Sequence, residues 1–183
     1  MKIMQTPIAG VVIIESSPFV DKRGSFSRFY CEDELGGVIG TRRIIQINQS
    51  RTSKVGAVRG MHYQRPPNAE MKLIRCIKGR IWDVAIDLRE GSPTFLKWHA
   101  EELTPENTRM VVIPEGCAHG FQVLESDSEL LYLHTAFYKH ENEDGVAHDE
   151  PQVAINWPLP VEDISERDLG FSSIPTNFLG VKL

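Results

Sequence analysis

Cysteine is scarce in this chain of 183 residues, and the cysteines present lie far apart. They are Cys31, Cys76 and Cys117, an odd number without a CxxC spacing. A disulfide framework needs an even set, and structural zinc sites need closely spaced pairs. The sequence therefore excludes both classes and predicts reduced thiols in a cytoplasmic protein.

The chain also lacks an excess of basic residues and any long apolar run. Lys and Arg number 20 against 25 Asp and Glu, which gives a formal net charge of −5. This balance disfavours a nucleic-acid-binding protein but is compatible with a small basic patch for a phosphorylated ligand. No segment approaches the roughly 20 apolar residues of a membrane span, and the N-terminal residues lack a signal-peptide pattern. We expect a soluble, cytoplasmic chain with no membrane or nucleic-acid partner.

What the sequence does contain is a series of short β-type segments, without internal repeats or low-complexity stretches. They are rich in Val, Ile, Phe and Tyr, and turn signals such as DKRG, KGR, REGSPT and PEG separate them. We expect strands over residues 10–16, 25–31, 43–50, 72–78, 80–88, 110–114, 120–125 and 130–137. A length of 183 residues fits one domain with its own core.

Alternation along these segments predicts sheets with two different faces. In residues 80–88, Trp82, Val84, Ile86 and Leu88 share one face, and Asp83 lies on the other. Helical character is limited to residues 32–37 and to a turn near residue 165, where Ser165 can cap a turn that contains Asp168. Many short strands with Gly and Pro turns predict an all-β antiparallel jelly roll with a few short helices.

Five polar or ionisable residues interrupt the apolar segments more often than a dry core would permit. They are Arg59, His62, Lys72, His119 and Tyr132. Each has an ordinary structural explanation: a satisfied core or solvated turn histidine, a lysine that snorkels, or a packed tyrosine with its hydroxyl at the rim. Together in one small barrel, they favour a polar ligand cavity.

These residue types suit the removal of a proton from a carbon next to a carbonyl and the return of a proton from the other side. Histidine, with a pKa of about 6.5, is the usual base, and a tyrosine phenol, with a pKa near 10, is a plausible donor. Lys72 can stabilise the oxyanion, which is worth roughly 3 kcal/mol in comparable sites. A carboxylate would fix the tautomer of the base. The candidates are Asp83, Asp87 and Asp168.

A succession of motifs between residues 58 and 158 resembles the RmlC-type dTDP-4-dehydrorhamnose 3,5-epimerase family. In chain order they are RGMHYQ, KLIRCIKG, WDVAIDLREGSPTFLKW, ELTPEN, IPEGCAHGFQVL, ELLYL, GVAHDEP and INWP. DKRGSF and QINQS upstream, and ISERD downstream, extend the resemblance over nearly the whole chain. The resemblance implies one cupin-like epimerase domain over residues 1–183 and a homodimer that needs no metal or other cofactor. It also implies inversion of C3, C5 or both in a nucleoside-diphosphate 4-keto-6-deoxyhexose, a step of deoxysugar biosynthesis.

By position, the resemblance assigns His62 as the general base with Asp168 as its partner, Tyr132 as the proton donor and Lys72 as the ligand of the keto oxygen. The residues it implies for nucleotide-sugar binding are Arg23, Arg28, Gln46, Asn48, Arg59, His119, Tyr138, Glu143 and Arg167. In this set, the guanidinium groups of Arg23 and Arg59 are the expected diphosphate contacts. The aromatic ring of Tyr138 is expected to stack on the nucleotide base.

Two departures from the family pattern lie on the nucleotide side. Arg28 stands where a base-contacting glutamate is usual, and Ile47 replaces the acid of a QDN element. A carboxylate only accepts hydrogen bonds and arginine only donates them, so the recognised base stays open. Arg28 is equally interpretable as a second phosphate contact or as a solvated strand residue. His134, in a variable pair after Tyr132, is a minor candidate for the pocket. The strand at residues 10–16 is a candidate for crossing to a partner subunit.

The sequence is also compatible with other functions. A metal-dependent cupin normally has an HxH pair on one strand, which this chain lacks, although His62, Glu70 and His119 can be imagined as ligands. A cupin that binds a sugar nucleotide without turnover would not need a base, an acid and a lysine together. A 3-epimerase or a 3,4-ketoisomerase acting on the same substrate class is the nearest alternative.

Overall fold

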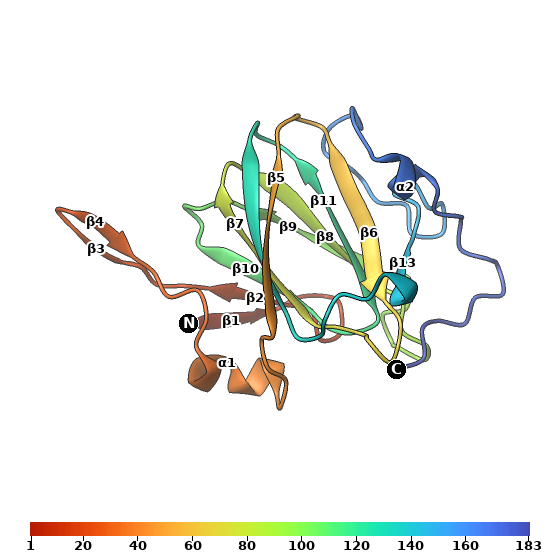
Figure 1. The fold of residues 1–183 in the computed structure, drawn as a ribbon, viewed down its shortest axis with the longest axis horizontal. Helices are drawn as coiled ribbons and strands as arrows, with labels where there is room; N and C mark the ends of the chain where they lie inside the picture. Colours follow the sequence, from red (N-terminus) through yellow and green to blue (C-terminus); the bar gives the residue numbers. More distant parts are fainter.

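Two antiparallel β-sheets face each other in the computed structural model, which describes residues 1–183 (Figure 1). The six-stranded sheet has the order β1 (Lys2–Gln5), β2 (Val12–Glu15), β10 (Arg109–Ile113), β7 (Lys72–Lys78), β12 (Ser128–His134), β5 (Gln46–Thr52). The five-stranded sheet has the order β13 (Glu143–Gly145), β6 (Val58–Gln64), β11 (Cys117–Val123), β8 (Ile81–Asp87), β9 (Trp98–Leu103). The predicted all-β, cupin-like jelly roll is confirmed.

The remaining elements are short. They are the hairpin of β3 (Phe19–Asp21) and β4 (Gly24–Phe26), α1 (Glu32–Ile39), the 3-10 turn η1 (His140–Asn142) and α2 (Glu166–Leu169). The hydroxyl of Ser165 accepts a hydrogen bond from the backbone N–H of Asp168 at 3.2 Å, so the predicted cap is present. Neither helix has the length and apolar character that a bilayer crossing requires. All three cysteines are unpaired, as expected.

Side-chain alternation sorts the apolar residues into an inner core and two outer ones. The inner core lies between the sheets and includes Ile74 and Leu130 from one sheet and Phe121 from the other. On the outer face of the six-stranded sheet, Leu35 and Ile39 of α1 cover the strands. The outer face of the five-stranded sheet packs against the C-terminal segment. Trp82, Val84, Ile86 and Leu88 all belong to that last cluster, so the predicted two-faced strand is confirmed.

The same alternation carries polar side chains inward at one end of the sheets. Ile74 points into the inner core, so Lys72, two residues earlier on β7, also points inward. Leu130 and Tyr132 both pack against the inner core from β12, and His134 continues this row. The apolar core thus gives way to a polar cavity along the same strands.

One of the two strand predictions near the N-terminus is wrong. The strand expected over residues 25–31 ends at Phe26, and Phe29 beyond it lies 4.1 Å over the guanidinium of Arg75. The strand expected over residues 10–16 is present as β2, which pairs on one edge with β1 and on the other with β10, and its crossing to a partner subunit stays a prediction. The segment that projects from the body is the β3–β4 hairpin (Figure 1).

Candidate active site

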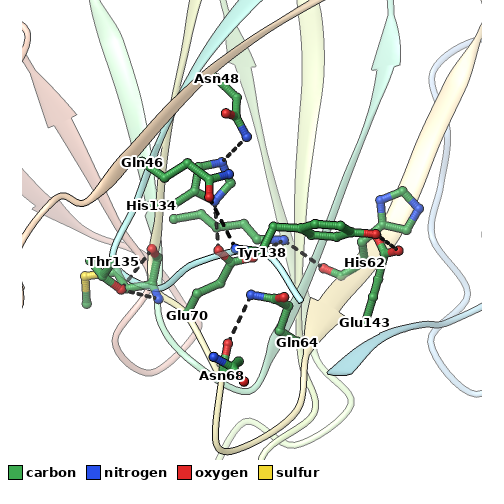
Figure 2. Close-up of polar contacts among 12 residues, drawn as sticks. Gln46, Asn48, His62, Gln64, Asn68, Glu70, His134, Thr135, Tyr138 and Glu143 are labelled. Atoms are coloured by element: carbon green, nitrogen blue, oxygen red, sulfur yellow. Dashed lines mark hydrogen bonds and ion pairs between the residues drawn. The ribbon is translucent and has the colours of Figure 1, made fainter. Parts of the chain in front are cut away.

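A polar cavity of about 260 Å³ lies between the two sheets, and both sheets contribute to its wall. Sixteen residues line it and only four are hydrophobic, so the cavity suits a polar ligand. The predicted site residues on its wall are Asn48, Arg59, His62, Lys72, His119, Tyr132, Tyr138, Glu143 and Arg167. Figure 2 shows how several of these side chains converge.

His62 on β6 is held from behind by Asp168 of α2. Its Nε2 lies 2.8 Å from Asp168 Oδ1, and the backbone N–H of Gly60 donates to Asp168 Oδ2 at 3.0 Å. Gly60 has a φ of +123°, and a Cβ there would come within 2.4 Å of the Gly120 Cα on β11. Only glycine therefore lets the strand adopt this path and present its N–H to the carboxylate.

The other two candidate aspartates have different partners. Asp83 on β8 lies 2.8 Å from Nε2 of His119, and Asp87 binds the guanidinium of Arg89 at 2.8 Å. Burial raises the pKa of Asp83, although the neighbouring His119 opposes this shift. Asp168 is thus the carboxylate that contacts His62.

Electrostatics favour a neutral imidazole at His62 and an ionised carboxylate at Asp168. Burial lowers the pKa of His62, and Asp168 opposes this shift while the charges of Arg167 and Lys72 add to it. Burial alone would raise the pKa of Asp168, but the hydrogen bonds from His62 and Gly60 hold it well below its usual range. With Nε2–H donated to Asp168, the lone pair of Nδ1 is left to accept a proton.

The opposite wall carries a phenol and a cation. Tyr132 on β12 meets His119 edge to face, with ring centroids 5.9 Å apart, and burial raises the pKa of its phenol, which keeps it protonated. The ammonium of Lys72 on β7 lies 3.4 Å from the backbone carbonyl oxygen of His62. The His62 imidazole thus comes from the five-stranded sheet, and the phenol and the ammonium come from the six-stranded sheet.

The mouth of the cavity is framed by a chain of contacts that begins at Tyr138 (Figure 2). The Tyr138 hydroxyl donates to Glu143 Oε2 at 2.9 Å, and Arg167 donates to Glu143 Oε1 at 3.2 Å. Arg167 Nη2 also lies 2.9 Å from His62 Nε2. Gln46, just outside the wall, accepts from the backbone N–H of Tyr138 at 3.2 Å. These contacts place an aromatic ring and a guanidinium beside the base.

Arg23 and Arg28 are not part of this cavity. Arg23 lies at the tip of the β3–β4 hairpin, paired with Asp21, and its side chain is 83% exposed. Arg28 follows the hairpin and is paired with Glu34 of α1. Within one chain both arginines therefore lie away from the cavity that contains His62, because the hairpin projects away from the sheets (Figure 1).

Two residues on the wall were underrated from the sequence. His134, a minor candidate in the sequence, faces the cavity. Glu70, considered in the sequence only as a metal ligand, has its Oε2 2.8 Å from His134 Nδ1. A period of two could have indicated that both residues face the cavity, because His134 lies two residues after Tyr132 and Glu70 lies two residues before Lys72. The imagined ligands His62, Glu70 and His119 each belong to a different histidine–carboxylate pair.

The fold and this cavity together define a jelly-roll protein with an acid–base site at one end of its facing sheets. The family described as dTDP-4-dehydrorhamnose 3,5-epimerase matches residues 5–175. A protein of that name from Sinorhizobium fredii is 39% identical over 180 residues, which cover 96% of this chain and 92% of the relative. The chain belongs to this family of isomerases, as the sequence motifs predicted.

Solved structures agree with this assignment. The dTDP-6-deoxy-D-glucose-3,5-epimerase RmlC from Legionella pneumophila, in complex with dTDP-4-keto-L-rhamnose, is 37% identical with a TM-score of 0.87. That match covers 100% of this chain and 92% of the other. ChmJ, a 3'-monoepimerase from Streptomyces bikiniensis in complex with dTDP-quinovose, is 28% identical with a TM-score of 0.86 and covers 93% and 86%.

Proposed function

We propose that this chain inverts C3, C5 or both in a nucleoside-diphosphate 4-keto-6-deoxyhexose. The observation that carries the proposal is a neutral imidazole, His62 backed by Asp168, on the sheet that faces the phenol of Tyr132. A base and an acid on opposing walls can act on the two faces of a sugar ring held between them. The relatives named above, which act on or bind dTDP sugars, support the substrate class.

The proposed reaction begins when Nδ1 of His62 removes the proton from a carbon next to the C4 ketone. The electron pair of the broken C–H bond forms the enolate, whose oxygen is stabilised by the ammonium of Lys72. Tyr132 then donates its phenolic proton to the same carbon from the other side, which inverts it. Solvent returns a proton to the phenolate and accepts one from the imidazolium, so no cofactor or metal is consumed.

Binding of the nucleotide part is assigned to residues at the mouth. We propose that Arg59 and Arg167 contact the diphosphate, because a guanidinium donates bidentate hydrogen bonds to phosphate oxygens. The exposed ring of Tyr138 is available to stack on the base, and Glu143 fixes its hydroxyl. The proposed contacts to the rest of the ligand are Gln46, Asn48 and His119. Since both sheets share one inner core, residues 1–183 are proposed to act as one domain.

The position of Arg23 and Arg28 supports a homodimer in which the hairpin serves a second copy. Three apolar side chains on the hairpin are largely exposed, namely Phe19, Val20 and Phe26. Burial of such side chains against another subunit is favourable. We propose that the hairpin delivers Arg23 and Arg28 to the mouth of the partner's cavity. The unpaired thiols fit the reducing conditions of the cytoplasm, where we propose the enzyme works.

The test of the proposed activity is proton exchange in deuterated buffer with dTDP-4-keto-6-deoxyglucose, followed by NMR. Label at C3 and C5 supports a 3,5-epimerase, and label at C3 alone supports a 3-epimerase like ChmJ. A change in the position of the carbonyl would instead identify a 3,4-ketoisomerase. If no 4-keto sugar nucleotide exchanges a proton, the proposal fails.

A protein that only binds the sugar nucleotide is separated by His62→Gln. A binding protein would lose a little affinity, whereas an epimerase would lose turnover and keep most of its affinity. The dimer is tested by mixing Arg23→Ala/Arg28→Ala with His62→Gln. Each variant is expected to be weakly active alone, and the mixture is expected to recover activity, because mixed dimers contain one complete site. A mixture no more active than its components would refute the shared site.

A further inference from the structure

Glu70, Lys72 and His134 form a second polar group on the wall of the cavity. Figure 2 shows Glu70 and His134 of this group across the cavity from His62. Glu70 Oε1 lies 3.2 Å from Lys72 Nζ, and Glu70 Oε2 lies 2.8 Å from His134 Nδ1. One carboxylate thus holds both neighbours. The side chains are nearly buried, 6% exposed for Glu70 and 11% for His134, so solvent screens these contacts little.

Strand pairing places Lys72 and His134 directly opposite each other on β7 and β12. Side chains that face each other in this way have Cβ atoms about 4.5–5.5 Å apart. If Lys72 holds the keto oxygen on C4, a group bound by His134 lies on the adjacent ring position. In a 4-keto-6-deoxyhexose, the neighbours of C4 are C3, which carries a hydroxyl, and C5, which carries a methyl group.

The hydrogen bonds of His134 leave one nitrogen for a ligand. Nδ1 donates to Glu70, whose carboxylate stays ionised because His134 and Lys72 lower its pKa against the opposing effect of burial. Nε2 of His134 then carries a lone pair. The protein group that contacts it is the side-chain amide nitrogen of Asn48 at 3.3 Å, which is a long contact to an exposed residue. A sugar hydroxyl can replace this contact, whereas a methyl group gains nothing from it.

We propose that His134 determines specificity by accepting a hydrogen bond from the C3 hydroxyl of the substrate. Glu70 is the positioning residue that fixes both His134 and Lys72. The inference rests on the function proposed above. The inference explains how the pocket distinguishes the two sides of the ketone. The side of the sugar with the hydroxyl faces β12, and the side with the methyl group faces the apolar ring of Phe121 or the mouth of the cavity.

The test compares dTDP-4-keto-6-deoxyglucose with the same compound lacking the C3 hydroxyl, using deuterium uptake next to the ketone. Wild type is expected to lose about 10-fold in kcat/KM when the hydroxyl is removed. His134→Met, which has similar volume but no strong acceptor, should show nearly equal values for both compounds. His134→Gln is close in shape to Met but can bond a hydroxyl, so it should keep part of the difference.

Glu70→Gln provides an independent test if His134→Met does not fold. Because Lys72 and His134 lose their common anchor, kcat is expected to fall about 10-fold with KM changed less than about threefold. Glu102→Gln, a surface carboxylate on β9 that lies 3.7 Å from Arg80, is the matched control and should behave as wild type.

The outcomes separate this inference from the proposed function. If wild type exchanges protons in neither compound, the proposed function itself has failed. If wild type is active and the effect of the hydroxyl is the same in His134→Met and His134→Gln as in wild type, only the assignment of His134 is overturned. A kcat of Glu70→Gln equal to that of the Glu102→Gln control would overturn the role of Glu70.

Discussion

Replacement of Asp168 by Asn tests the link between the buried carboxylate and the base. In the native site Asp168 accepts from His62 Nε2 at 2.8 Å, from the Gly60 N–H at 3.0 Å and from Arg167 Nε at 3.1 Å. Asn has nearly the same shape, so the helix turn at Ser165 should persist. What is lost is the negative charge that stabilises the imidazolium formed when His62 takes a proton.

The size of the effect follows from that charge. A hydrogen bond to a charged group contributes about 1.5–3 kcal/mol, and about 1.36 kcal/mol corresponds to one pKa unit. Loss of the bond should therefore lower the pKa of His62 by about one to two units and slow proton abstraction about 10- to 150-fold. The acid limb of kcat/KM, which already lies below the usual histidine value because burial lowers the pKa of His62, should move to still lower pH.

The assay is deuterium uptake from pH 4.5 to 8, with Asp127→Asn as the control. Asp127 forms an exposed pair with Arg51 at 2.8 Å, and neither residue lines the cavity. Thermal unfolding supplies a second readout. Because the pKa of Asp168 is depressed in the folded state, its stabilisation is present above the unfolded value of about 3.9 and is lost as the pH falls further. Wild-type exchange rates and an unshifted acid limb in Asp168→Asn would refute the reasoning.

Further substitutions test the donor, the backbone and the helix. Tyr132→Phe should keep proton exchange next to the ketone but lose inversion, because His62 can return the proton only to the face it came from. NMR of the recovered sugar measures both, and inverted product at the wild-type rate would contradict the prediction. Gly60→Ala should destabilise the chain by about 1–3 kcal/mol in urea unfolding, because the new Cβ meets Gly120 and the φ is positive. Leu35→Ala should cost about 2–5 kcal/mol in the same measurement, since that side chain is fully buried under the sheet.

The sequence was informative wherever period-two alternation operated. It predicted the two faces of β8, and the helix expected over residues 32–37 is two residues longer in the structure. Alternation could not identify which of the three aspartates contacts His62, because that contact depends on how the C-terminal segment returns to β6. Asp168 is 106 residues from His62, and no local pattern encodes that contact.

The N-terminal region was harder to predict because it contains two competing patterns. Residues 25–31 alternate like a strand, but the chain leaves the ladder after Phe26 so that Phe29 can cover the buried guanidinium of Arg75. Burial lowers the pKa of that group because it removes the cation from water, and the contact with the Phe29 ring offsets part of this cost. The hairpin left behind is exposed in one chain, and this exposure is the basis for the proposal that it contacts a second copy.

The presence of Glu70 beside Lys72 sets a limit on the catalytic effect of the lysine. A buried ammonium without a partner is costly, so the carboxylate at 3.2 Å lowers the cost of burying the Lys72 ammonium. The same carboxylate attracts the ammonium away from the enolate oxygen during the reaction. Charge on the enolate must therefore compete with Glu70, and His134, which draws the other carboxylate oxygen at 2.8 Å, weakens that competition. We therefore expect His134 to affect the stabilisation of the enolate as well as the recognition of the hydroxyl in the proposed reaction.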